Sequence, residues 1–334
     1  MTALVTGASG FVGSHVVEAL RGQGLPVRTL VRTDAAAQSL RGAGIDVQVG
    51  DVCDPRVLAE AVRGADVVYH CAAAVGPAYS PSQIHDISLA GARHLLEALK
   101  QQGSGRAVIL TSVNVLGTRN LDPATEDMPC RRSRDASADV KIEIEALTHD
   151  YVQRHGVDAA ILRPGLIYGP RDRHNLPQMS SALRRGKFTF LGSRDNIAPI
   201  VYISDVVEAI LLAGRTPASH GQVYHITDGT RTTIGQFVDR LAELLGCPPP
   251  HKVLPYAVPY LACGLFDTLA ALRLYRGRPP ISRAGLRHLG TSRFFPIDRA
   301  SRELGYDPRV FYQEGLSTAV NWMEEHAHEH SFVA

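Results

Sequence analysis

Short runs of apolar, often β-branched residues alternate along the first half of the chain with stretches in which apolar side chains recur every three to four positions. The short runs predict strands at 3–5, 27–31, 47–49, 66–70, 107–111 and 159–162. The periodic stretches predict helices at 14–21, from 54 onward, at 87–99 and at 141–154. Repeated β-α units of this length predict an α/β fold with a doubly wound parallel sheet and helices on both faces.

The pattern changes after Pro164, where proline and glycine become frequent. A strand followed by a helix returns at 201–213, and a further strand and helix are expected at 223–226 and 233–245. The segment 247–280 is aliphatic, aromatic and punctuated by proline. We therefore expect a smaller, mixed C-terminal lobe beside the main sheet.

A glycine-rich segment joins the first predicted strand directly to the first predicted helix. Its informative residues are Thr6, Gly7, Gly10, Phe11, Val12 and Gly13. At such a junction glycines permit a tight turn, close approach to a pyrophosphate and close packing of helix on strand. The N-terminus of the helix then offers free N–H groups to the phosphates. The strand–loop–helix context predicts a dinucleotide-binding site.

The end of the second predicted strand bears on cofactor choice, because an acidic residue there would bind the ribose 2′-hydroxyl of NAD. Val31 and Arg32 occupy this position, and Asp34 comes too late. Arg32 can pair with a 2′-phosphate, bidentately where geometry allows. The alternative is a solvated surface arginine. The sequence favours NADP(H) over NAD(H).

Several further motifs follow in one order: Gly50-Asp51-Val52, His70-Cys71-Ala72-Ala73, 163–170 with its Arg-Pro-x-x-x-Tyr-Gly-Pro pattern, 201–206 and 303–308. With the glycine loop, they make the chain resemble the extended short-chain dehydrogenases/reductases and NAD-dependent epimerases/dehydratases. The 3β-hydroxysteroid dehydrogenase branch is the most similar. The resemblance implies a Rossmann-type NAD(P)-binding domain formed by 1–169 plus about 198–228, and a substrate lobe formed by about 170–197 and 229–334.

The same resemblance assigns residues to the cofactor. Asp51 and Val52 would contact the adenine. Further cofactor contacts would come from Cys71, Ala72, Ala73, Pro164 and Ile167.

Members of this family use a Ser or Thr, a Tyr and a Lys, with the last two spaced Tyr-x-x-x-Lys. Ser112 and Lys141 match. The resemblance implies that Lys141 holds the nicotinamide ribose, while Ser112 donates a hydrogen bond to a substrate oxygen as charge develops on it. Ser137 stands where the tyrosine would be, and Ser88 where a helix asparagine is usual. An aliphatic hydroxyl is a far weaker acid than a phenol, so Ser137 is not expected to be an essential acid.

Three explanations for the lost phenol stay open. Hydride transfer can persist, with Ser112, Ser137 or water assisting a substrate that stabilises its own alkoxide. A different side chain can replace the phenol, with Asp139, Tyr168 and Tyr202 as candidates. The protein can also bind a dinucleotide without turnover, as a sensor. The first explanation is favoured.

The expected function is that of an NADP(H)-dependent ketoreductase or dehydrogenase for a mainly apolar steroid-, terpenoid- or polyketide-like molecule. A sugar-nucleotide epimerase or dehydratase is the alternative, with Arg184, Arg185 and Arg194 available for a diphosphate. We expect 170–197 and 247–280 to close an apolar pocket beside Ser112. The apolar run 253–274 is interpreted as a packed helix pair, or else as a lid or a shallow membrane contact.

Composition narrows the remaining possibilities. A net charge of +2 gives no nucleic-acid footprint, and five scattered cysteines predict neither a disulfide framework nor a zinc site. His326, His328 and His330 alternate near the end, where a solvated terminus is favoured over a metal site. We find no targeting or transmembrane segment in the sequence, so a cytoplasmic protein, possibly a homodimer, is expected.

Overall fold

The central element is a parallel sheet in the order β10-β6-β5-β4-β1-β2-β3. Its strands are β1 (Ala3–Thr6), β2 (Val27–Val31), β3 (Asp46–Val49), β4 (Val67–His70), β5 (Arg106–Leu110), β6 (Asp158–Pro164) and β10 (Val223–Ile226). These come from a computed structural model that describes residues 1–76, 78–117, 120–255 and 290–326. The direction of strand progression reverses between β1 and β4, and ligands of such sheets bind in the crevice at the carboxyl ends flanking that point.

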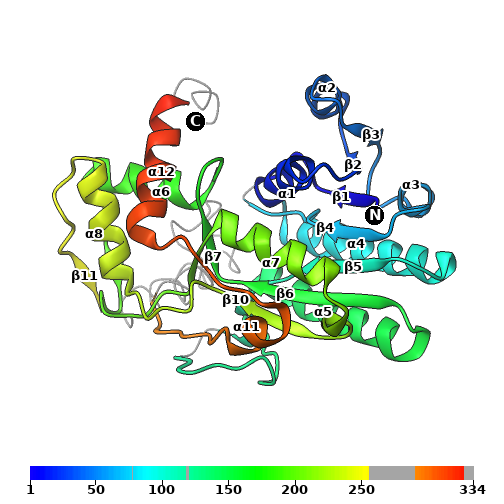
Figure 1. Cartoon of the computed structure of the whole chain (residues 1–334). Coiled ribbons are helices and arrows are strands. Elements are labelled where there is room, and N and C mark those ends of the chain that lie inside the picture. Colours follow the sequence, from blue (N-terminus) through cyan, green and yellow to red (C-terminus); the bar gives the residue numbers. More distant parts are fainter. Residues whose placement is uncertain (77, 118–119, 256–289, 327–334) are drawn as a thin grey trace, which may run out of the picture.

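Helices cover both faces of this sheet (Figure 1). On one face lie α1 (Phe11–Gly22), α2 (Asp34–Gly42) and α7 (Ile203–Arg215), which share a core with residues such as Val5 and Val206. On the other face lie α3 (Pro55–Val62), α4 (Pro81–Gln102) and α5 (Ala136–His155), packed around Leu58, Leu95 and Ile144. The predicted α/β doubly wound architecture is confirmed.

A second group of elements gathers beside the carboxyl ends of the strands, at the left of Figure 1. Its members are α6 (Asn175–Arg184), α8 (Ile234–Leu244), α12 (Tyr312–Glu325) and the short strands β8 (Phe190–Leu191) and β11 (Val253–Leu254). The strands β7 (Leu166–Tyr168) and β9 (Ile200–Tyr202) pair with each other, and α11 (Asp298–Leu304) lies against β10.

Two helices start at least five residues earlier than the periodicity predicted, and caps explain both shifts. α4 begins at Pro81 rather than at 87, because Ser80 and Gln83 form a capping box. α5 begins at Ala136 rather than at 141, because the carboxylate of Asp135 accepts a hydrogen bond from Ser137 N–H. Ser137 therefore lies one turn before Lys141 on a continuous helix.

Some predictions fall outside the described residues. They concern most of the apolar run 253–274 and also His328, His330 and Cys263. Among the described residues, no helix combines the length and the apolar character that a membrane span requires. The cysteines that are described, Cys53, Cys71, Cys130 and Cys247, are free thiols.

Candidate active site

The glycine loop has no room for side chains at two of its positions. Gly7 has a φ of +70°, and a Cβ there would lie 2.7 Å from Ala72 N. A Cβ on Gly13 would lie 2.3 Å from the carbonyl oxygen of Gly7. The loop after β1 is thereby held tightly against the loop after β4 and against the start of α1, as a dinucleotide cradle requires.

The N-terminus of α1 is free to bind an anion. Its cap residue is Gly10, which provides no side-chain hydrogen bond, and no acidic residue lies in the first turn. The N–H groups of Phe11, Val12 and Gly13 therefore keep their hydrogen-bonding capacity at the positive end of the helix dipole. This donor set fits a pyrophosphate, so the residues present fit the predicted dinucleotide.

The ends of β2 and β3 carry the residues assigned to the adenosine half. Arg32 directly follows β2 and is exposed, and its Nη2 donates a hydrogen bond to Tyr79 Oη at 2.8 Å. Asp51 follows β3 and accepts a hydrogen bond from Cys53 N–H, while Val52 is buried beneath α4 beside Gly91. Sequence reasoning did not identify Tyr79, because 47 residues separate it from Arg32.

At the end of β4 a buried histidine is joined to the glycine loop. His70 Nδ1 and Thr6 Oγ1 are 2.9 Å apart, and the same hydroxyl accepts a hydrogen bond from Ala72 N–H. Burial lowers the pKa of His70 to about 4, so its imidazole is neutral near pH 7. Burial likewise raises the pKa of Cys71 to about 12 and keeps it a thiol.

Ser112 follows β5 and caps the short 3₁₀ helix Val113–Leu116. Its Oγ accepts a hydrogen bond from Asn114 N–H at 3.3 Å and donates to the carbonyl oxygen of Pro164 at 3.5 Å. The second bond is long, so this hydroxyl can turn to a better acceptor at little cost. Pro164 ends β6, which brings the carboxyl ends of β5 and β6 together beside Ser112, and Ile167 follows on β7.

Lys141 and three other polar side chains line one small cavity between the sheet and α4 and α5. The cavity measures about 20 Å³, and its polar lining comes from His70, Ser88, Ser137 and Lys141. Ala72 and Ala73 line it too, so it adjoins the segment assigned to the cofactor. Burial lowers the pKa of Lys141, while Asp135 and Glu145 act in the opposite direction. Ser88 and Ser137 therefore line the same cavity.

A buried network fixes the helix that carries Lys141. One turn after Lys141, the Glu145 carboxylate accepts hydrogen bonds from Arg163 Nε at 3.0 Å and Nη2 at 2.7 Å, and from Thr111 Oγ1 at 2.6 Å. Cys130 Sγ also donates to it at 3.5 Å. Glu145 and Arg163 are both buried, so α5 is fastened to the ends of β5 and β6.

The candidate substitutes for the phenol are engaged elsewhere. The Asp139 carboxylate accepts hydrogen bonds from the backbone N–H groups of Ser133 and Arg134. Tyr168 packs edge-on against Tyr202 and Phe237, and burial raises its pKa far above the usual value. None of the three candidates, Asp139, Tyr168 or Tyr202, is among the residues that line the cavity beside Lys141.

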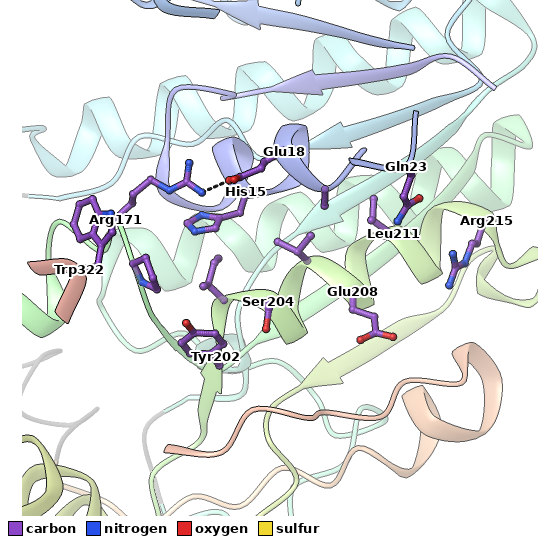
Figure 2. A pocket seen from close by; sticks show the side chains of 14 residues that line it. His15, Glu18, Gln23, Arg171, Tyr202, Ser204, Glu208, Leu211, Arg215 and Trp322 are labelled. Atoms are coloured by element: carbon purple, nitrogen blue, oxygen red, sulfur yellow. Dashed lines mark hydrogen bonds and ion pairs between the residues drawn. The ribbon is translucent and has the colours of Figure 1, made fainter. Parts of the chain in front are cut away.

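A much larger cavity, of about 760 Å³, lies between α1, α7 and α12 (Figure 2). His15 of α1 and Glu208 of α7 line it from opposite sides, the Glu18 carboxylate pairs with Arg171, and Trp322 lies at one end. Ser112 does not line this cavity. The expected apolar pocket beside Ser112 stays a prediction, since much of the segment 247–280 lies outside the described residues.

Within the described ranges, no three His, Cys, Asp or Glu side chains are grouped as a metal site would need. His326, the one described residue of the alternating tail histidines, instead stacks on Trp322 with 4.5 Å between ring centroids.

Comparisons with known proteins agree with this geometry. The model of the NAD dependent epimerase/dehydratase family matches residues 3–227. A ketoreductase of 4-hydroxy-2-methyl-3-oxo-4-farnesyl-3,4-dihydroquinoline-1-oxide from Stigmatella aurantiaca is 30% identical over 95% of both chains. A 2-alkyl-3-oxoalkanoate reductase from Stenotrophomonas maltophilia is 27% identical over 95% of this chain and 97% of that one. A Thermus thermophilus UDP-glucose 4-epimerase in complex with NAD superposes with a TM-score of 0.75 at 25% identity, over 97% of this chain and 99% of its own.

Proposed function

The chain belongs to the NAD-dependent epimerase/dehydratase family, and from this premise we propose a specific reaction for it. As an NAD(P)-dependent oxidoreductase of the extended short-chain dehydrogenase type, it is an NADPH-dependent ketoreductase for a mainly apolar carbonyl compound. The observation that carries this proposal is the placement of Ser112 and Lys141 at the carboxyl edge of the sheet that also bears the glycine cradle. The farnesylated and alkylated substrates in the names of the two reductases support an apolar substrate.

Each part of the cofactor has residues suited to it. The N-terminus of α1 would bind the pyrophosphate, Arg32 the 2′-phosphate, and Asp51 with Val52 the adenosine side. Lys141 would hold the nicotinamide ribose. The bound dinucleotide supplies the hydride that the substrate carbonyl carbon accepts.

Ser112 is the residue that would act on the substrate directly. Its hydroxyl can leave the Pro164 carbonyl, 3.5 Å away, and donate a stronger hydrogen bond to a substrate oxygen that is becoming an alkoxide. The hydroxyl of Ser137 is a much weaker acid than the phenol of a tyrosine, so a different group donates the proton to this oxygen.

The sugar-nucleotide alternative receives less support from the same structure. Arg194 is bound to Asp239 and to the carbonyl oxygen of Pro250, and Arg184 pairs with Glu324. Two of the three arginines considered for a diphosphate are therefore already engaged. A non-catalytic sensor would instead bind NADPH tightly and would not oxidise it with any carbonyl compound.

The test is NADPH consumption with a panel of 2-alkyl-3-oxoalkanoates, prenylated quinolone ketones and keto-steroids, compared with UDP-sugars. We expect turnover with at least one apolar ketone. Replacing Ser112 by alanine should lower kcat/KM by about 10²–10³, the usual effect of losing one oxyanion donor. Ser137→Ala should cost less than about 10-fold, because a weakly acidic hydroxyl adds little as a general acid.

Two results would contradict the proposal. One is tight NADPH binding without oxidation by any ketone in the panel, which is the behaviour of a sensor. The other is an inactive Ser137→Ala enzyme beside an active Ser112→Ala enzyme, which would reverse the assigned roles.

A further inference from the structure

The small cavity beside Lys141 has the size of a single water molecule. Its volume of about 20 Å³ exceeds the roughly 10–15 Å³ that one water needs, and it is too small for a ribose or a nicotinamide ring. Most of its lining is apolar, but it also includes the polar side chains of His70, Ser88, Ser137 and Lys141, and a buried water needs two to four such partners.

These side chains also have hydrogen-bonding capacity to spare. Ser88 Oγ accepts from Ala74 N–H at 3.3 Å, and its own hydrogen meets no acceptor within the described residues. His70 uses Nδ1 for Thr6 and leaves Nε2 without a hydrogen bond in the described part of the chain. Ser137 Oγ and Lys141 Nζ likewise have no side-chain or backbone partner among the residues described. A buried water typically makes about three hydrogen bonds, and this lining offers four partners.

We propose that one ordered water in this cavity is the proton donor to the substrate oxygen, held there by Ser88, Ser137, His70 and Lys141 in place of a tyrosine hydroxyl. The inference rests on the proposed ketoreductase function. Ser88 and His70 are positioning residues in this scheme, because they contact the water and not the substrate.

The proton balance of the step is simple. As negative charge develops on the substrate oxygen, an O–H bond of the water breaks and a new O–H bond forms on that oxygen. The resulting hydroxide takes a proton from Lys141 Nζ, and the lysine regains one from solvent. One proton is consumed per carbonyl reduced, and every protein group returns to its starting state. Burial assists this transfer because it lowers the pKa of Lys141.

Ser88 provides a matched pair of variants. Ser88→Val fills the cavity and removes a hydroxyl, whereas Ser88→Ala removes the same hydroxyl but leaves room for the water. We expect a high-resolution crystal structure of the ligand-free protein to show one water in the parent and in Ser88→Ala, and none in Ser88→Val. Ser88→Val should lose about 10² in kcat, within the usual range for general acid catalysis, with KM and the NADPH Kd unchanged.

Ser137→Val and Ser137→Ala repeat the comparison from α5, at a half-buried site where a larger side chain is easily accommodated. They keep the test decisive if Ser88→Val does not fold. A solvent deuterium isotope effect on kcat should be present in the parent and in both alanine variants.

A dry cavity in an active parent enzyme would overturn this inference and leave the ketoreductase proposal standing. Full activity in a valine variant whose crystal structure lacks the water would do the same. Absence of turnover with every carbonyl compound would overturn both proposals, whether or not the water is present.

Discussion

Arg32 is the residue on which the proposed preference for NADPH depends most directly. Its guanidinium is oriented by Tyr79 Oη at 2.8 Å, so the cation lies ready at the end of β2. We expect Arg32→Ala to weaken NADPH binding by about 10- to 100-fold, the range of a charge-assisted hydrogen bond, and to leave NADH binding unchanged. Tyr79→Phe should produce a smaller loss in the same direction. Calorimetric titration of the parent and both variants with NADPH and with NADH measures these constants, and equal or tighter NADH binding by the parent protein would contradict the prediction.

At this scale the sequence was informative about residue types and less so about partners. The glycines could be interpreted from their place between strand and helix, because their roles are local. Tyr79 beside Arg32 and Ser88 beside Ser137 could not be found in this way. Each pair joins segments that are far apart in the sequence, and only the folded structure brings them together.

At the scale of elements, the attachment of α5 depends on the ion pair between Glu145 and Arg163. Both groups are buried, so removal of one leaves an uncompensated charge in the interior. We expect Glu145→Ala to lower the free energy of unfolding by about 3–5 kcal/mol. Glu143→Gln, on the same helix but in exposed contacts with His85 and Arg132, should cost less than about 1 kcal/mol.

Urea denaturation of both variants measures this difference. The double change Glu145→Leu with Arg163→Met should recover much of the loss, since an apolar pair removes the buried charges together. Similar stabilities for Glu145→Ala and Glu143→Gln would show that the buried pair does not fasten the helix.

Helices and strands were predictable where apolar periodicity was strong, and less so where caps or tertiary packing determine where an element begins. α2 escaped prediction because its alanine-rich sequence buries little, although Thr33 caps it. α6 follows a proline- and glycine-rich stretch and starts beside the buried carboxylate of Asp172, which accepts three backbone N–H bonds. This carboxylate cap is a local contact over two to four residues, but the periodicity of apolar side chains does not indicate it.

For the molecule as a whole, two buried histidines make stability depend on pH. Burial lowers the pKa of His225 to about 3 and of His70 to about 4, whereas both have values near 6.5 when unfolded. The unfolded chain therefore binds more protons below pH 6.5, and stability falls as the pH drops through that value. Each histidine contributes about 1.4 kcal/mol per pH unit until its folded pKa is reached.

Urea denaturation at several pH values between 7.5 and 5 checks this slope. His225→Leu should make it shallower, because one of the two buried histidines is removed, and its side chain lies against Phe295 with no hydrogen bond to either ring nitrogen from the described residues. His155→Leu, at the exposed end of α5, is the control and should leave the slope as it is. An unchanged slope in His225→Leu would refute this account.

The loop that contains Asp122 and Asp127 pairs with two arginines that lie far away in the sequence. Arg231 makes a bidentate pair with Asp122 at 2.8 Å, and Arg299 binds both oxygens of Asp127. Neither contact follows from local sequence, since the partners are more than 100 residues apart. Patterns of apolar and polar residues along the chain therefore do not predict such long-range ion pairs.

The large cavity between α1, α7 and α12 has an optical consequence. Trp322 lines it, and this is the one tryptophan in the sequence. Ultraviolet excitation at the red edge of protein absorption therefore reports on a single, known position. Any molecule entering that cavity, and any shift of α12 relative to α1, is read out as a change in emission wavelength without an attached dye.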